Sequence, residues 1–174
     1  MTDLLIVVDM QNDFIDEALG TPEAAGIVQR AVEKIKDFEG TIIATLDTHG
    51  EDYLDTQEGR HLPVSHCIRN TRGWELNEQV KKALEKKGYR TVTKPTFGSP
   101  ELIELIKREF DVSGLQIQLI GLCTDICVVS NALLLKASFP EAKISVDSSC
   151  CAGVTQEKHE AALMTMESCQ IEIV

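Results

Sequence analysis

Three side chains that could perform nucleophilic catalysis lie at or just beyond short apolar segments of the chain. They are a carboxylate, an amine and a thiol: Asp9, Lys94 and Cys127. A thiolate is a nucleophile, and a neighbouring carboxylate can take the thiol proton and later hand it to a leaving group. A lysine ammonium and a helix N-terminus both favour the thiolate. If the fold brings these groups together, they predict a cysteine nucleophile with an acid–base partner.

Each of these residues also has an explanation that involves no chemistry. Cys127 could be a small packed residue at a buried helix start, because free cysteines are among the most buried residues. Asp9 could cap the polar turn after its strand, and Lys94 could be a solvated strand end before Pro95. Residue types alone leave both interpretations open.

A second group combines two histidines with a carboxylate. Asp47 and His49 are two positions apart at the end of an apolar run, and His66 lies further along the polar stretch that follows. Side chains two apart in a strand point to the same face, and imidazole with carboxylate suits zinc, iron or manganese. Glu58 and His61 lie between them in the sequence. No short fixed spacing links His49 to His66, so solvated loop residues are the alternative.

Strands and helices alternate along the chain and must position these side chains. Strands are predicted over 4–8, 41–46, 90–93, 116–120, 143–146 and 171–174, and helices are predicted to begin at Thr21, Trp74, Ser99, Thr124 and Gln156. This alternation specifies right-handed βαβ units, so we predict a doubly wound α/β fold with a mainly parallel sheet and helices on both faces. The length of 174 residues, without a linker or repeat, predicts one domain over residues 1–174.

The carboxyl ends of the predicted strands gather the candidate residues at one edge of the sheet, where open parallel sheets bind their ligands. Asp9, Asp47 and Lys94 follow the first three strands, and residues 121–127 follow the fourth. The polar stretch over 48–73 is too long for an idle connection in a compact domain. We therefore expect this stretch to contribute to function.

The charge balance excludes several classes of partner. Lys and Arg number 17 and Asp and Glu number 28, a net charge of −11, which argues against nucleic acid or anionic membranes. Apolar runs are far shorter than a membrane span and no signal peptide is visible, so a cytoplasmic location is expected.

None of the six cysteines forms a CxxC pair, and we predict that Cys150, Cys151 and Cys169 are small buried residues.

Five segments carry a resemblance to a known family. They stand in the family's order over nearly the whole chain: residues 7–14 (VVDMQNDF), 45–49 (TLDTH), 62–67 (LPVSHC), 93–99 (TKPTFGS) and 121–128 (GLCTDICV). Together they resemble the cysteine hydrolase superfamily that contains isochorismatases and nicotinamidases. The resemblance implies the isochorismatase-like hydrolase fold, a parallel sheet of about six strands with flanking helices.

The resemblance also implies a role for each member of the first group. Cys127 matches the family's nucleophile, Asp9 its general base and acid, and Lys94 its electrostatic partner. A cis peptide is implied just before Cys123, where most members have alanine. The backbone N–H groups of Cys123 and Cys127 would then form an oxyanion hole.

The nicotinamidase-like branch of the superfamily carries a metal site, and the second group matches its ligands. Asp47, His49 and His66 are the implied ligands, with Glu58 as a fourth candidate, whereas His61 matches no family element. The expected ion is divalent, zinc first with iron or manganese as alternatives. The resemblance implies that the ion binds a ring nitrogen or ordered waters and so orients the substrate.

The substrate is less well specified than the chemistry. After Phe14 the branch usually continues with a Gly-Gly-x-Leu segment, which this chain lacks. Phe14, Tyr53, Trp74 and Phe97 are the candidates for an aromatic wall around a ring. We predict hydrolysis of a small primary carboxamide through a cysteine thioester, with nicotinamide converted to nicotinate and ammonia as the leading case. Another small amide, a ureido compound or an isochorismate-like vinyl ether is the alternative.

Two further expectations concern partners and class. Members of the superfamily are commonly dimers or tetramers, so we expect a homo-oligomer. Receiver domains of signalling proteins are also doubly wound, with paired acids after the first strand and Lys-Pro after a late strand. Here Asp9-Met10 lacks the paired acids and Lys94-Pro95 follows the third strand. An enzyme is therefore favoured over a receiver domain.

Overall fold

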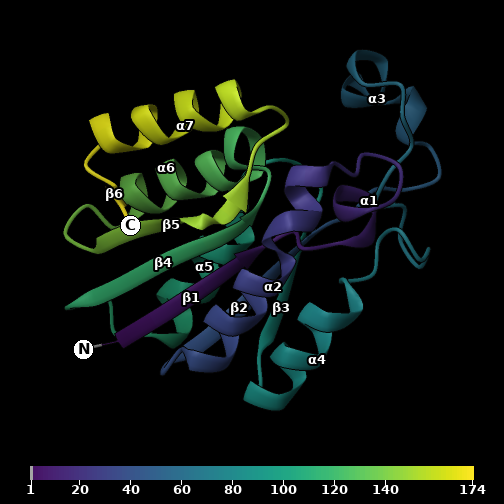
Figure 1. Ribbon diagram of the computed structural model, residues 1–174. Helices are drawn as coiled ribbons and strands as arrows, with labels where there is room; N and C mark the ends of the chain where they lie inside the picture. Colours follow the sequence, from purple (N-terminus) through teal and green to yellow (C-terminus); the bar gives the residue numbers. More distant parts are fainter. Residues whose placement is uncertain (1) are drawn as a thin grey trace.

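A parallel six-stranded sheet in the order β3-β2-β1-β4-β5-β6 forms the centre of the molecule (Figure 1). The computed structural model describes residues 2–174. The strands are β1 (Thr2–Val8), β2 (Thr41–Asp47), β3 (Arg90–Lys94), β4 (Leu115–Leu122), β5 (Lys143–Ala152) and β6 (Glu172–Ile173). The helices are α1 (Asn12–Ile15), α2 (Pro22–Asp37), α3 (Gln57–His61), α4 (Glu78–Lys87), α5 (Pro100–Glu109), α6 (Val129–Ser138) and α7 (Gln156–Ser168). This arrangement confirms the predicted doubly wound α/β fold.

The central strand β1 is buried on both faces and divides the core in two. Leu5 and Val7 pack beneath α2 and α4, whereas Leu4, Ile6 and Val8 face α5, α6 and α7. A strand covered on both sides needs a continuous apolar run, which explains why this segment shows no polar alternation. Within the described residues, no helix combines the length and apolar character that a membrane crossing requires.

The strand order places a ligand crevice between β1 and β4. Chain order reverses at this pair, and doubly wound sheets bind ligands at such a reversal, beyond the carboxyl ends of the strands. Asp9 directly follows β1, and Cys127 comes five residues after the end of β4 at Leu122. The sheet topology alone therefore brings the carboxylate and the thiol to one crevice.

Most helices begin where their capping residues predict. The hydroxyl of Thr21 accepts a hydrogen bond from the Ala24 amide at 3.0 Å, and Pro22 occupies the first helical position of α2. Ser99 caps α5 in the same way. Such caps satisfy amides that have no partner within the helix, each contributing about 1 kcal/mol.

Two predicted helix starts were wrong. The helix expected from Trp74 begins only at Glu78, because the side chain of Asn77 caps it and the preceding Leu76 pairs with Gln11 in a short β-bridge. The helix expected from Thr124 is preceded by a π turn, η2 (Thr124–Val128). There the Cys123 carbonyl accepts from the amides of both Ile126 and Val128, so Thr124 lies inside the turn and does not cap it.

The remaining differences are local. Strand β5 extends to Ala152, past the predicted end at Val146, because its pairing with β4 resumes after a register shift. Cys150 and Cys151 are buried as predicted, but Cys169 is exposed. Cys169 follows the last residue of α7, where the chain turns at the surface, so a residue type that is usually buried was misleading there.

Candidate active site and metal centre

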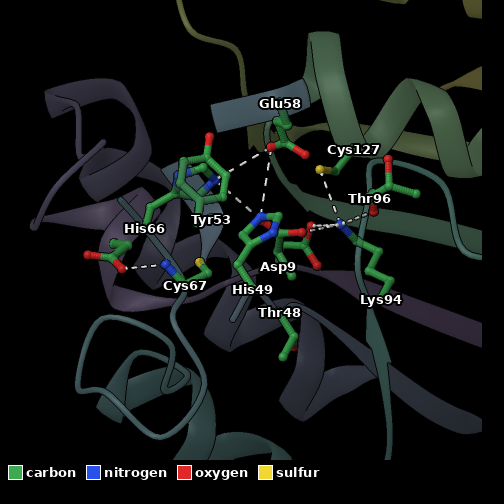
Figure 2. Close-up of polar contacts among 12 residues, drawn as sticks. Asp9, Thr48, His49, Tyr53, Glu58, His66, Cys67, Lys94, Thr96 and Cys127 are labelled. Carbon is green, nitrogen blue, oxygen red and sulfur yellow. Dashed lines mark hydrogen bonds and ion pairs between the residues drawn. The ribbon is translucent and has the colours of Figure 1, made fainter. Parts of the chain in front are cut away.

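The carboxylate, the ammonium and the thiol of the first group meet at the crevice (Figure 2). Lys94 Nζ lies 2.6 Å from Asp9 Oδ2 and 3.3 Å from Cys127 Sγ. All three side chains are buried. The ammonium therefore lies within contact distance of both the potential base and the potential nucleophile.

Neighbouring strands hold these side chains in place. Asp9 adopts a left-handed backbone conformation with φ of 46°, which turns the chain away from β1. Thr45 on β2 donates its hydroxyl to Asp9 Oδ1 at 2.7 Å. Lys94 Nζ donates to the Thr96 carbonyl at 3.0 Å. Each charged group thus has a partner that restricts its orientation.

Burial and mutual contact shift the pKa values of this group. Burial raises the pKa of Asp9 against the opposing effect of Lys94. Burial acts to lower the pKa of Lys94, but Asp9, Cys127 and Asp47 outweigh it and hold that pKa above its usual range. Burial and the Asp9 carboxylate raise the pKa of the Cys127 thiol, with Lys94 opposing them. Burial and the Asp9 carboxylate thus oppose the thiolate that a helix start and a lysine favour.

The second group also converges, with its nitrogen and oxygen atoms directed at one another. The ligand atoms of Asp47, His49 and His66 all lie within 4.8 Å of one another. Asp47 Oδ2 is 2.9 Å from Nε2 of His49 and 3.5 Å from Nε2 of His66. Glu58 Oε1 lies 3.8 and 3.9 Å from the same two nitrogens. This set of two imidazoles and two carboxylates suits a divalent transition metal.

Surrounding contacts orient the two imidazoles. Nδ1 of His66 is 2.8 Å from the Val64 carbonyl, which can only accept, so this contact directs Nε2 toward the carboxylates of Asp47 and Glu58. The Tyr53 ring packs against His49 at 4.7 Å and against His66 at 4.9 Å between centroids. Burial raises the pKa of Tyr53 to about 12, and its hydroxyl donates to Leu62 O. The types of ligand atom, imidazole nitrogen and carboxylate oxygen, and their orientation both fit a bound metal ion.

Asp47 joins the two groups. Its Oδ1 lies 3.4 Å from Lys94 Nζ, and its Oδ2 faces both histidines. Burial acts to raise the pKa of Asp47, but hydrogen bonds from His49 and His66 and the charge of Lys94 hold that pKa well below its usual range. Asp47 is therefore ionised and serves both centres.

Gln11, three residues past the end of β1, holds the backbone of Asp47. Its side-chain nitrogen donates to the Asp47 carbonyl at 2.9 Å, and its oxygen accepts from the Asp47 amide at 2.8 Å. The positioning roles of Gln11 and Thr45 were not predicted from the sequence. A buried glutamine and a threonine in an otherwise apolar strand were the available signals, but neither identifies its partner.

A cavity of about 280 Å³ opens beside both centres. Its polar lining includes Asp47, His66 and Cys127, and its apolar walls include Phe14 and Phe97. A larger and more open hollow at the opposite edge of the sheet has neither a cysteine nor a histidine in its described lining.

The structure places only some of the remaining candidate site residues at the cavity. Tyr53 and Trp74 are not among the described residues that line the cavity: Tyr53 is buried behind the histidines, and the Trp74 indole donates to Thr48. His61 bonds to its own short helix, away from the metal group. The peptide between Leu122 and Cys123 is cis, as the resemblance implied, and Cys123 lines the cavity beside Cys127.

Known proteins resemble this chain over its whole length. The family model for the isochorismatase domain matches residues 3–174. The nicotinamidase of Schizosaccharomyces pombe is 25% identical over 211 residues, covering 98% of this chain and 91% of that protein. The crystal structure of a nicotinamidase/pyrazinamidase from Bacillus subtilis matches with a TM-score of 0.86 and 26% identity, over 100% of both chains. The structure of a Pyrococcus horikoshii pyrazinamidase in complex with zinc matches with a TM-score of 0.81 and 28% identity, over 100% of this chain and 99% of that one.

Proposed function

Since this chain belongs to the isochorismatase family and is a hydrolase that acts on amides, we propose that it hydrolyses nicotinamide to nicotinate and ammonia. The observation that carries the proposal is the junction at Asp47 of a buried Asp–Lys–Cys group with an Asp–His–His group, both facing one cavity. Relatives described as nicotinamidase and pyrazinamidase support the choice of a ring carboxamide.

In the proposed reaction Cys127 is the nucleophile and Asp9 the general base and acid. Asp9 takes the thiol proton as sulfur attacks the carboxamide carbon, and Lys94 stabilises the negative charge on sulfur. The backbone N–H groups of Cys123 and Cys127 are proposed to stabilise the developing oxyanion. Asp9 then gives the proton to the departing nitrogen, so that ammonia leaves and a thioester remains.

Water completes the proposed cycle. Asp9, again ionised, takes a proton from a water molecule that attacks the thioester carbon. The acid leaves as Cys127 recovers its proton through Asp9. The high pKa of the buried thiol suits this order, because sulfur gives up its proton only when an acceptor and an electrophile are both in place.

Asp47, His49 and His66, with Glu58 as a fourth ligand, are the residues proposed to hold a divalent ion, zinc first with iron or manganese as alternatives. When bound, the ion supplies a fixed positive charge that a ring nitrogen or ordered water can contact, which orients the substrate. The zinc complex of the Pyrococcus horikoshii protein supports this assignment.

Phe14 and Phe97 are proposed to flank the ring. Both line the cavity. A pyridine ring would bury its faces against apolar side chains and present its amide to Cys127. We also propose that residues 1–174 act as one catalytic domain within a homo-oligomer, a dimer or a tetramer.

The test is ammonia release from a matched set of amides: nicotinamide, pyrazinamide, benzamide and a small aliphatic amide. Each is assayed with zinc-loaded protein and with protein treated with a chelator. We expect the two ring amides with a nitrogen to be the best substrates and to depend most on metal. Turnover of an aliphatic amide or a ureido compound, with none of nicotinamide, would contradict the proposed substrate.

A further inference from the structure

Asp13 is a buried carboxylate that the proposed reaction does not use. It lies in the short helix α1 and is 8% exposed. Its partners within residues 2–174 are backbone amides: Oδ2 accepts from Cys67 N at 2.7 Å and Oδ1 accepts from Ala18 N at 3.3 Å. A buried charge that is held only by amides is costly unless those hydrogen bonds are strong. Its position therefore calls for an explanation beyond packing.

The Cys67 amide belongs to the peptide that directly follows His66 (Figure 2). Cys67 has a φ of 47°, a left-handed conformation that residues other than glycine, asparagine and aspartate rarely adopt. Such a backbone persists only where its surroundings hold it. The charge-assisted bond from the Cys67 amide to Asp13, 54 residues away in sequence, supplies that restraint.

The same residue connects the two histidines of the metal group. The Cys67 carbonyl accepts a hydrogen bond from the His49 amide at 3.0 Å. The Phe14 ring, next to Asp13 in the chain, packs edge-on against the His66 ring at 5.5 Å. Fixing Cys67 therefore positions the backbone of both imidazole ligands. His66 directly precedes Cys67 in the chain, and His49 bonds to it across the loop.

The end of the long loop lies directly against this carboxylate. Gly73 lies against it, and a Cβ added at Gly73 would come within 2.1 Å of Asp13 Oδ2. The Asp13 amide in turn donates to the Gly73 carbonyl at 3.0 Å. The glycine is thus the residue that allows α1 and the end of the long loop to approach each other closely.

We propose that Asp13 is a positioning residue for the metal centre: through the Cys67 peptide it holds His49 and His66 in the arrangement that binds the ion. The inference rests on the proposed metal site and extends it to a side chain that touches neither metal nor substrate. Residues that orient metal ligands typically change metal affinity by about 10–100-fold when they are removed.

The first experiment compares zinc affinity in Asp13→Ala, Asp13→Asn and Asn12→Ala, using competition with a chromophoric chelator. Asn12 is the matched control, because its side chain in the same helix donates to the Arg72 carbonyl and does not touch Cys67. We expect zinc affinity to fall about 10–100-fold in Asp13→Ala. In Asp13→Asn it should fall only a few-fold, because the amide oxygen can still accept from Cys67, and Asn12→Ala should match the wild type. The visible spectrum of bound cobalt should change in Asp13→Ala alone.

Two outcomes of this comparison would overturn the proposal. One is wild-type zinc affinity in Asp13→Ala, and the other is an equal loss in Asn12→Ala. A role in stability alone would lower the melting temperature without separating alanine from asparagine in zinc affinity. If Asp13→Ala does not fold, Gly73→Ala replaces it, since the added methyl group would push the carboxylate off the Cys67 amide and should weaken zinc binding likewise.

Hydrogen exchange of the metal-free proteins separates this proposal from the metal assignment itself. We expect the Cys67 and His49 amides to exchange faster in Asp13→Ala, with the central strands unaffected and Asn12→Ala unchanged. Unchanged exchange at both amides would overturn the positioning role whatever the metal content. A wild-type protein that binds no zinc, but shows the expected exchange, would remove the metal from the proposed function while the structural link from Asp13 to both histidines stands.

Discussion

The nucleophile group and the metal group share Asp47 but are built in different ways. Asp9 and Lys94 stand at the carboxyl ends of β1 and β3, and Cys127 follows β4, so the register of the sheet sets their separations. In the metal group only Asp47 belongs to a strand. His49 and His66 come from the loop that follows β2, and they are brought together by contacts between distant segments.

The two groups also differ in charge. The nucleophile group contains its own cation, because Lys94 contacts Asp9, Asp47 and Cys127. The metal group directs two carboxylates and two imidazoles at one point, where Lys94 is the one lysine or arginine among residues 2–174 that makes an ion pair with Asp47. The first group is electrostatically complete without a ligand, whereas the second is arranged to receive a cation. Substitutions should therefore separate covalent chemistry from substrate orientation.

The largest effect is expected for Cys127→Ala. Removing the sulfur removes the covalent path, so ammonia release should fall to the uncatalysed background while zinc content stays at the wild-type level. Cys123→Ala is the matched control, because only its backbone N–H is proposed to act. Equal losses in the two variants, measured as kcat for nicotinamide, would show that the roles are wrongly assigned.

Asp9→Asn comes next. The amide keeps the shape of the side chain but cannot accept the thiol proton, so kcat should fall by about 10²–10⁴-fold, with slower alkylation of Cys127 at neutral pH. Asp3→Asn, an exposed position on the same strand, should leave both rates unchanged. Wild-type turnover and alkylation in Asp9→Asn would exclude Asp9 from the mechanism.

His49→Ala tests the other group. Zinc content should drop from about one equivalent to a small fraction of it, because one of three close ligands is lost. KM should rise more for nicotinamide than for an aliphatic amide, while Cys127 alkylation stays at the wild-type rate. His61→Ala, an exposed histidine outside the group, serves as control. Loss of alkylation in His49→Ala would mean that the two groups are not separable.

Thr45→Val is expected to have the smallest effect of the four. It removes the hydroxyl that donates to Asp9 Oδ1 at 2.7 Å but keeps the side-chain volume. A hydrogen bond to a charged group is worth about 1.5–3 kcal/mol, so kcat should fall by about tenfold or more without loss of zinc. Thr41→Val, at the start of the same strand, is the control. No change in kcat would remove Thr45 from the group that orients the base.

The contrast between the two groups also explains what the sequence could predict. Residues at strand ends follow from hydrophobic periodicity, because parallel strands end at one edge, so Asp9 and Lys94 could be placed together without a structure. Residue types alone grouped His66 with His49 but left solvated loop residues as the alternative, since the position of His66 depends on a loop whose path is set by contacts such as Asp13 to Cys67. Those contacts have no periodic signal.

The misplaced elements have local causes of the same kind. Trp74 lies in an apolar-periodic stretch, but a cap at Asn77 and the bridge to Gln11 start the helix later. The upward shift in the pKa of the Cys127 thiol could not be predicted either. A helix start and a lysine indicate a thiolate, whereas burial and the facing Asp9 carboxylate, known only from the fold, outweigh both.

The most direct test of the central claim is to look for the covalent intermediate. Wild-type protein is mixed with nicotinamide, quenched in acid within one turnover, digested and analysed by mass spectrometry. A nicotinoyl group is expected on the peptide that contains Cys127, absent from Asp9→Asn and removed when the reaction is left to complete. Ammonia release at the normal rate, with an unmodified Cys127 peptide at every quench time and full turnover retained in Cys127→Ala, would contradict the proposed thioester mechanism.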